Sequence, residues 1–214
     1  MAPPDGTPQP TQSRKTGAHS KQAATWLTPE QIEAVHDACL TKEFPTYLQD
    51  RNETIIVLLA DTGLRVSELV ALDWDYLALD ADPPELILPG RIQKGNKRDA
   101  YLDLDRETAR QLHRYRNRVW KKTVAMFPSR QSERMSRTSV RRMVKKAAQI
   151  GGVRPYVAGA GRGEPSDVSP HTFRHSIAFR MIRREDKRLE DVMLRLRHSS
   201  IQTTDQVYGH LRRR

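Results

Sequence analysis

Cysteine is almost absent from this sequence, and long apolar runs are missing from it. The 214 residues include one cysteine, Cys39, so an intrachain disulfide and a cysteine-based zinc site are both excluded. No apolar run approaches the roughly 18 residues that span a bilayer, and the N-terminus has no apolar signal-peptide core. We therefore expect a soluble, cytoplasmic protein in a reducing compartment.

Acidic residues are outnumbered by basic ones. Lys and Arg number 37 against 26 Asp and Glu, which gives a net charge of +11. The excess of basic residues is local. Residues 106–146 hold 14 basic and two acidic residues, whereas residues 42–90 hold three basic and ten acidic residues. Such a one-sided field attracts a polyanion, and phosphates are the usual partner, although a solvated helix face is the alternative. Membrane binding is disfavoured because the basic segments lack a continuous apolar face.

The pattern of apolar residues and turn signals divides the chain into a tail and one domain. Residues 1–26 are predicted to be a disordered basic tail, followed by a domain over 27–214 that belongs to the α+β class, is mainly α-helical and has one small antiparallel sheet. Helices are expected from Pro29 onward and over 52–62, 66–72, 105–122, 137–150, 170–184, 187–196 and 200–208. Strands are expected at 86–88 and 101–104, joined by a turn over 93–98, and a loop is expected over 153–168.

Two histidines and an arginine stand together at a predicted helix start. His171 and Arg174 are three residues apart and share one helix face, just after Pro170. Zinc binding by His171 and His175 is disfavoured, because no Glu lies between them and Arg174 would place a cation beside the metal. The group is better suited to an anion.

Two further segments contain candidate functional side chains. Arg65 follows Gly63, a residue placed to end a helix, and this position suits a guanidinium that is aimed at a site. Glu68, one turn later, could orient Arg65, although most such pairs are surface ion pairs. His198 lies ten residues before Tyr208, and a tyrosine near the chain end is often a packing residue.

Taken together, these segments resemble the catalytic domain of the tyrosine recombinases, the phage-integrase family. The resemblance extends over about residues 27–210 and rests on motifs in the family's order: TGLRVSEL (62–69), QKGNKRDAYLDL (93–104), HTFRH (171–175), LRHSS (196–200) and TTDQVYGH (203–210). It implies the family's fold, double-stranded DNA as partner and no metal or ATP cofactor. It also implies site-specific cleavage and rejoining of DNA, for integration or excision of a mobile element.

The resemblance also assigns roles by position. The catalytic residues that it implies are Arg65, Lys94, His171, Arg174, His198 and Tyr208. Lys97 is the rival of Lys94 as the hairpin lysine, and the resemblance favours Lys94, which stands immediately before Gly95. His175 and His210 are left with structural roles.

Elementary chemistry agrees with these roles. Without a metal, two guanidiniums can offset the charge of a pentacoordinate phosphorane by gripping its non-bridging oxygens with paired hydrogen bonds. Attack by Tyr208 would store the energy of the broken linkage in a 3′-phosphotyrosyl bond. Lys94 is the expected general acid for the leaving 5′-oxygen. His171 would assist proton removal from the tyrosine, and His198 would donate to a phosphate oxygen.

Two other kinds of functional site, a metal-nuclease site and a P-loop, are disfavoured by the residues at particular positions. Four aspartates between residues 73 and 82 could suggest a metal nuclease, but positions 91–93 hold no carboxylate where an acid-x-Lys nuclease needs one. The alternating glycines of 159–163 are not followed by the Lys-Ser/Thr of a P-loop. We interpret the first as solvated loop charge and the second as a flexible loop.

The sequence departs from the family pattern in three places. We expect no N-terminal core-binding domain, because only about 26 residues precede the catalytic domain, so DNA would be bound through one face with help from the tail. Arg197 stands where the family usually has glycine, which could displace His198 or add a phosphate contact. Residues 209–214 leave little chain for C-terminal exchange between subunits, although strand exchange would need four active sites and hence a tetramer on DNA.

The helix predicted at 137–150 is the candidate DNA-contact element. Its basic residues form a broad face and are Arg137, Arg141, Arg142, Lys145 and Lys146. Two other functions stay open: a non-catalytic DNA-binding regulator derived from a recombinase, and a topoisomerase-like nicking and closing enzyme.

Overall fold

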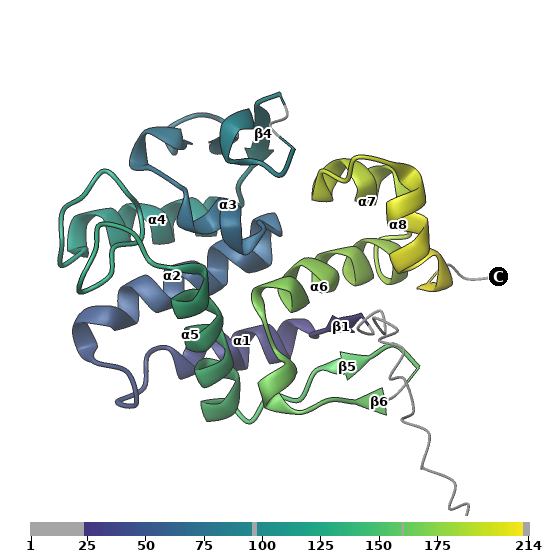
Figure 1. The fold of residues 1–214 in the computed structure, drawn as a ribbon, viewed down its shortest axis with the longest axis horizontal. Coiled ribbons are helices and arrows are strands. Elements are labelled where there is room, and N and C mark those ends of the chain that lie inside the picture. The colour runs from purple at the N-terminus through teal and green to yellow at the C-terminus, as the bar shows by residue number, and fades with distance from the viewer. Residues whose placement is uncertain (1–23, 96–97, 160, 212–214) are drawn as a thin grey trace, which may run out of the picture.

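The computed structural model describes residues 24–95, 98–159 and 161–211, and helices dominate it (Figure 1). In chain order the helices are α1 (Pro29–Ala38), α2 (Thr46–Thr62), α3 (Val66–Val70), α4 (Arg106–Arg118), α5 (Arg137–Ile150), α6 (Pro170–Arg183), α7 (Leu189–Leu196) and α8 (Ile201–Tyr208). Single 3₁₀ turns are η1 (Trp74–Tyr76), η2 (Gly90–Ile92), η3 (Pro165–Asp167) and η4 (Gly209–Leu211). The strands are β1 (Thr25–Trp26), β2 (Leu77–Ala78), β3 (Glu85–Leu88), β4 (Ala100–Asp103), β5 (Tyr156–Val157) and β6 (Gly161–Arg162). Across the described ranges, no helix combines the length and apolarity that crossing a membrane requires.

Local sequence signals set several helix ends where they were predicted. The Thr28 hydroxyl accepts a hydrogen bond from the Gln31 backbone N–H at 3.3 Å, and the Gln31 side chain accepts one from the Thr28 N–H at 3.0 Å, so α1 begins with a capping box. α5 has the predicted bounds, and the Ser136 hydroxyl caps it. α2 begins at Thr46 rather than at residue 52, and α4 ends at Arg118 rather than at 122. Propensity alone places such boundaries poorly.

The structure contains two small antiparallel sheets, whereas one was predicted. The predicted hairpin forms the sheet β2–β3–β4, in which the buried Leu86 pairs with the buried Leu102. The second sheet, β1–β5–β6, was not predicted. It begins ordered structure before Leu27, and it turns part of the loop expected over 153–168 into a hairpin. Strands of two residues carry too little periodicity to be recognised, and β1 finds its partner far away along the chain.

Buried apolar side chains form two clusters within the described residues, and α6 connects them. The larger cluster lies among α1 to α5 and the β2–β3–β4 sheet and includes Phe173 near the start of α6. The smaller cluster joins the rest of α6 to α7 and α8, and its members are Ile177, Ala178, Ile182, Leu189, Val192, Leu196, Tyr208 and Leu211. In Figure 1, α6 runs between the α7–α8 pair and the β1–β5–β6 sheet. The candidate nucleophile therefore belongs to the smaller cluster.

A single glycine sets the close approach between the end of α2 and this smaller cluster. Gly63 has the left-handed conformation expected of a helix-ending glycine, with φ of 62°, and its N–H donates to the Leu59 carbonyl at 3.1 Å. A Cβ atom at Gly63 would lie 2.9 Å from Cδ1 of Ile177 and 3.1 Å from Cδ2 of Leu196. Glycine thus allows the chain to reverse where α6 and α7 are packed, and this places Arg65 beside both helices.

Candidate active site

Arg65 is held by a carboxylate that is buried completely. It stands at the N-terminus of α3, where its Nη1 donates to Oε1 of Glu68 at 2.8 Å and its backbone N–H donates to Oε2 of the same group at 2.8 Å. The Glu68 side chain is 0% exposed, so this is a buried contact and not the surface ion pair that most such sequences form. Burial would raise the pKa of Glu68, but the guanidiniums of Arg197 and Arg65 outweigh burial and hold that pKa below its ordinary value.

Arg174 is fixed between two backbone carbonyls. Pro170 opens α6 and places Arg174 in the helix's second turn, where the residue is 1% exposed. Its Nη1 donates to the Gly63 carbonyl at 2.6 Å, and its Nη2 donates to the carbonyl of Leu196. Burial lowers the pKa of Arg174 to about 9, with Arg65 and Arg197 adding to the effect. The group still carries its charge at neutral pH, in a position set before any ligand arrives.

Tyr208 ends α8 with its phenol enclosed by protein. The residue is 2% exposed, and its hydroxyl lies 2.5 Å from Nδ1 of His175. Burial raises the pKa of Tyr208, while Arg174 and Arg65 act in the opposite direction. The phenol is therefore protonated in this state, because the nearby positive charges offset only part of the effect of burial.

Two further histidines, His171 and His198, line the same pocket from different elements. His171 lies in the first turn of α6, and its ring centroid is 4.6 Å from that of His175. The protein around His171 displaces water and lowers its pKa, and the charges of Arg174 and Arg65 lower it further, so the ring is neutral at pH 7. His198 follows α7, where its Nδ1 lies 2.8 Å from the Thr204 hydroxyl, and its ring is stacked 6.2 Å from the Tyr208 ring.

Lys94 reaches the same place from the β3–β4 connection. The residue is exposed and lies on the turn after η2. The buried Gln93 beside it fixes the base of this turn, because its Nε2 donates to the Leu88 and Arg98 carbonyls, both at 2.9 Å. Lys97, the rival candidate, lies outside the described residues.

The six candidates meet in one pocket although they come from five separate motifs. The pocket has a volume of about 540 Å³, and its lining includes Arg65, Lys94, His171, Arg174, His198 and Tyr208. Three chain segments supply positive charge, and α8 supplies the phenol. The pocket lining thus combines guanidinium donors for an anion with the phenol of Tyr208.

His175 also lines this pocket, a placement that was not predicted from the sequence. The sequence suggested a structural role, whereas its Nδ1 is the hydrogen-bond partner of the candidate nucleophile. A signal was present, since residues 171, 174 and 175 share one helix face by their spacing. The side chain of His210, the other histidine given a structural role, lies outside the described part of the chain.

Arg197 neither displaces His198 nor contacts the pocket. It adopts a left-handed conformation with φ of 53°, its residue is 8% exposed, and its Nη2 donates to Glu68 Oε2 at 2.9 Å. His198 remains among the residues that line the pocket. In this structure the Arg197 side chain thus turns toward the buried carboxylate and does not line the pocket.

The five basic residues predicted to contact DNA lie on the exposed side of α5 and do not line the pocket. Lys146 donates to the Glu43 carbonyl at 2.5 Å, and its ammonium lies 4.7 Å from the Phe44 ring centroid. Arg142 and Lys146 border a hollow of about 650 Å³ together with Arg51. Arg141 and Lys145 have no contact of this kind among the described residues, so they are the better placed pair for an external phosphate.

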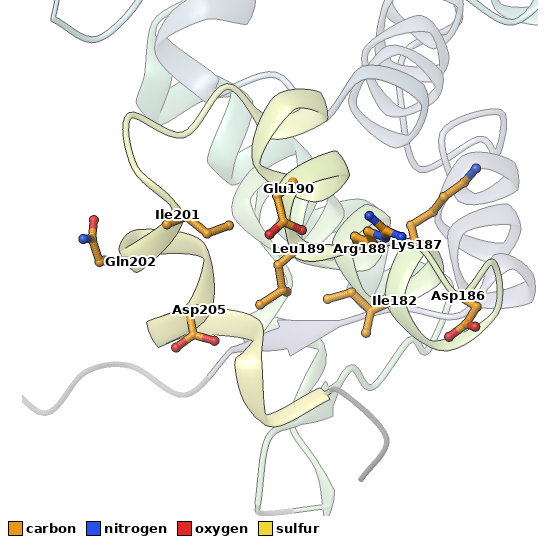
Figure 2. A pocket seen from close by; sticks show the side chains of 9 residues that line it. All are labelled: Ile182, Asp186, Lys187, Arg188, Leu189, Glu190, Ile201, Gln202 and Asp205. Carbon is orange, nitrogen blue, oxygen red and sulfur yellow. The ribbon is translucent and has the colours of Figure 1, made fainter.

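A hollow of about 660 Å³ lies between the α6–α7 connection and α8 (Figure 2). Its wall mixes the apolar Ile182 and Leu189 with opposite charges, such as Lys187 and Asp205, and none of the six candidates lines it. The mixture supplies no convergent set of donors. The pocket around Arg65 is therefore the candidate active site.

Comparisons with known proteins identify the family of the chain. The sequence profile described as "Phage integrase family" matches residues 25–214. The chain is 31% identical over 193 residues to the tyrosine recombinase XerC of Roseiflexus castenholzii, a match that covers 86% of this chain and 54% of that protein. The chain thus spans about half the length of the curated relatives it matches.

Solved structures share the fold. A XerH site-specific recombinase bound to a palindromic difH substrate superposes with a TM-score of 0.69 at 19% identity, covering 88% of this chain and 50% of that one. The XerA recombinase superposes with a TM-score of 0.65 at 20% identity, covering 90% and 67%. With the profile match over most of its length and the shared fold, this chain belongs to the phage integrase family.

Proposed function

We propose that this chain is the catalytic domain of a site-specific DNA recombinase, which cleaves and rejoins double-stranded DNA through a 3′-phosphotyrosyl intermediate. One observation carries the proposal: the phenol of Tyr208 and the guanidiniums of Arg65 and Arg174 line a single pocket. That combination matches the needs of phosphodiester cleavage by a tyrosine, which are a nucleophile and fixed positive charge around the phosphorus.

Arg65 and Arg174 hold the scissile phosphate in this proposal. Their side chains are oriented in advance, the first by the Glu68 carboxylate and the second by the carbonyls of Gly63 and Leu196. Donors that are already in place need no reorganisation when charge develops on the phosphorane oxygens. Removing one of them should therefore slow cleavage more than it weakens DNA binding.

The roles implied by the family resemblance complete the proposed proton transfers. The Tyr208 oxygen forms a bond to phosphorus while the bond from phosphorus to the 5′-oxygen breaks. The phenolic proton passes to the neutral His171, and Lys94 gives a proton to the leaving 5′-oxygen. His198 donates to a non-bridging oxygen. Rejoining reverses these steps, when a 5′-hydroxyl attacks the phosphotyrosine and the phenol regains its proton.

The reaction serves integration or excision of a mobile element, with four copies of the catalytic domain acting on two duplexes. The membership in the phage integrase family supports the first part. The second follows from stoichiometry, because exchanging both strands of two duplexes requires four tyrosines. The exposed basic side chains of α5 are the proposed contacts to the DNA backbone.

A covalent adduct provides the direct test. The full chain is incubated with a library of nicked duplexes that contain a randomised core, and complexes that survive detergent are isolated and their DNA is sequenced. Tyr208→Phe should abolish the adduct. Tyr115→Phe is the matched control, because Tyr115 is 1% exposed and its hydroxyl donates to the Met126 carbonyl at 2.9 Å, away from the pocket. That variant should keep forming the adduct.

Other outcomes would favour the alternative functions. DNA binding without any adduct contradicts the proposal and favours a non-catalytic regulator. Relaxation of supercoiled DNA without exchange between duplexes favours a nicking and closing enzyme, which would use the same covalent chemistry.

A further inference from the structure

Arg197 occupies a backbone conformation that favours glycine. Among the described residues, only Asp186 and Arg197 have positive φ without being glycine. A left-handed conformation strains an arginine, and such strain persists where the surrounding contacts require it. The contacts of Arg197 identify what holds it there, since its guanidinium lies against the buried Glu68 and not in solvent.

The side chain of Arg197 shares one carboxylate with Arg65. Oε2 of Glu68 accepts from Nη2 of Arg197 at 2.9 Å, and Oε1 accepts from Nη1 of Arg65 at 2.8 Å. The Glu68 side chain is 0% exposed, so water does not compete for either oxygen. Two guanidiniums therefore share one buried carboxylate, and the orientation of that carboxylate links their positions.

The backbone at the end of α7 completes the arrangement. The carbonyl of Leu196 accepts from Arg174, and the next carbonyl, that of Arg197, accepts from Nη2 of Arg65 at 3.5 Å. Two consecutive carbonyls at a helix C-terminus, where the helix dipole is negative, therefore contact both candidate phosphate-binding guanidiniums. The left-handed turn at Arg197 follows the first carbonyl and precedes His198 in the pocket.

We infer that Arg197 is a positioning residue for cleavage, which fixes Glu68 and thereby sets the orientation of Arg65. The inference rests on the proposed function, because it gives this chain a specific means of presenting one of the two phosphate-binding arginines. The family usually has glycine at this position. Arg197→Gly therefore tests directly whether this chain depends on the arginine side chain. Glycine also suits φ of 53°, so Arg197→Gly removes the side chain and leaves the backbone path allowed.

Cleavage and binding should respond differently to this substitution. On a nicked duplex recovered as an adduct, Arg197→Gly should lower the single-turnover rate of adduct formation by about tenfold or more, since small displacements of a positioning group can cost about a hundredfold. The Kd for the same duplex, measured by fluorescence anisotropy at fixed salt, should change less than about threefold. Arg197→Lys, which restores the charge but not the planar fork, should recover part of the rate.

Arg195→Ala is the matched control. Arg195 lies two residues earlier and also pairs with a buried carboxylate, because its Nη2 is 3.2 Å from Oδ1 of Asp61, but it does not contact Glu68. The control variant should keep adduct formation within about threefold of the parent rate, as expected for a partly exposed pair. An equal loss in Arg195→Ala and Arg197→Gly would overturn the inference, because the effect would then be a general loosening of α7. Parent-like cleavage by Arg197→Gly would also overturn it.

A second measurement needs no DNA and separates this inference from the proposed function. In the parent, NMR should show slow rotation of the Arg65 guanidinium, with separate Nη–H signals. In Arg197→Gly those signals should average, while those of Arg174 stay separate, since two carbonyls hold that group. Unchanged Arg65 signals would refute the positioning role even if the enzyme cleaves DNA. If the parent forms no adduct, the proposed function fails, and this measurement still decides whether Arg197 orients Arg65.

Discussion

At the scale of single residues, the contact between His175 and Tyr208 sets the position of the phenol in the structure without DNA. The hydroxyl and Nδ1 lie 2.5 Å apart in a pocket where the tyrosine is 2% exposed. Burial lowers the pKa of His175 to about 3, with His171 and Arg174 adding repulsion. The imidazole is therefore a neutral partner of the phenol at physiological pH. Its contact with the hydroxyl holds the phenol in place in this structure.

This lowered pKa makes a prediction about stability and pH. Below pH 6.5 the unfolded chain binds a proton at His175 that the folded chain excludes, so stability falls as the pH drops from about 6.5 toward 3. His175→Asn removes this effect. The free energy of unfolding of the parent, relative to the variant, should fall by about 2 kcal/mol between pH 7 and pH 5.

Urea unfolding at the two pH values measures this difference. His36, whose pKa is raised by its hydrogen bond to Glu53, acts in the opposite sense, but it is present in both proteins and cancels. A difference that is constant between the two pH values would mean that His175 is protonated within the folded chain.

At the scale of elements, the end of α2 decides where the candidate arginines meet. Gly63 lets α2 stop against Ile177 of α6 and Leu196 of α7, and its carbonyl accepts from Arg174. The same turn leads directly into Arg65 at the start of α3. One backbone position thus connects the packing of three helices to the geometry of both guanidiniums.

Gly63→Ala should destabilise the protein by about 2–4 kcal/mol, because a left-handed alanine is strained and its Cβ would press on both neighbouring side chains. Gly152→Ala is the matched control, since Gly152 has φ of 61° and no atom within 4 Å of an added Cβ. That control should lose only about 1–2 kcal/mol from backbone strain. Equal losses in urea unfolding would show that the close approach at Gly63 contributes nothing.

At the scale of the whole molecule, the exposed basic side chains and the candidate nucleophile are supported by different hydrophobic clusters. The larger hydrophobic cluster supports α5, which carries exposed basic side chains, whereas the smaller cluster holds Tyr208 on α8. α6 joins the two and carries Arg174 at their boundary. The proposed DNA contacts and the proposed chemistry in the pocket therefore belong to different elements of the structure.

If the basic face of α5 contacts DNA as proposed, we expect the affinity for DNA to depend on salt. Each phosphate contact contributes about 0.9 to the slope of log Kd against log salt concentration. The double variant Arg141→Gln, Lys145→Gln should therefore reduce this slope by about 2. Arg183→Gln with Arg184→Gln, at the end of α6 away from His171, is the matched control for the same loss of charge and should leave the slope unchanged. Equal slopes in the two double variants would place the DNA elsewhere.

Strong local signals account for the parts that could be predicted. The Thr28 cap, the Gly63 terminus and the amphipathic α5 depend on residues that are neighbours along the chain, so the start of α1, the end of α2 and both ends of α5 lie where they were predicted. The start of α2 has no such local signal and was predicted too late in the chain. The β1–β5–β6 sheet was missed because its two-residue strands are stabilised only by pairing with distant segments. The six candidate residues were named through the motif resemblance. Their spacing along the chain does not by itself show that they come together in the folded protein.

The amino-acid order by itself determined the helical pattern, the basic character and the set of side chains available for phosphate chemistry, because these properties follow from composition and short-range periodicity. Only the tertiary structure decided that Glu68 is buried between two arginines, that His175 contacts Tyr208 and that Arg197 turns away from the pocket. Those outcomes depend on which helix ends are brought together and on how water is excluded between them. Neither is set by any one segment of the chain.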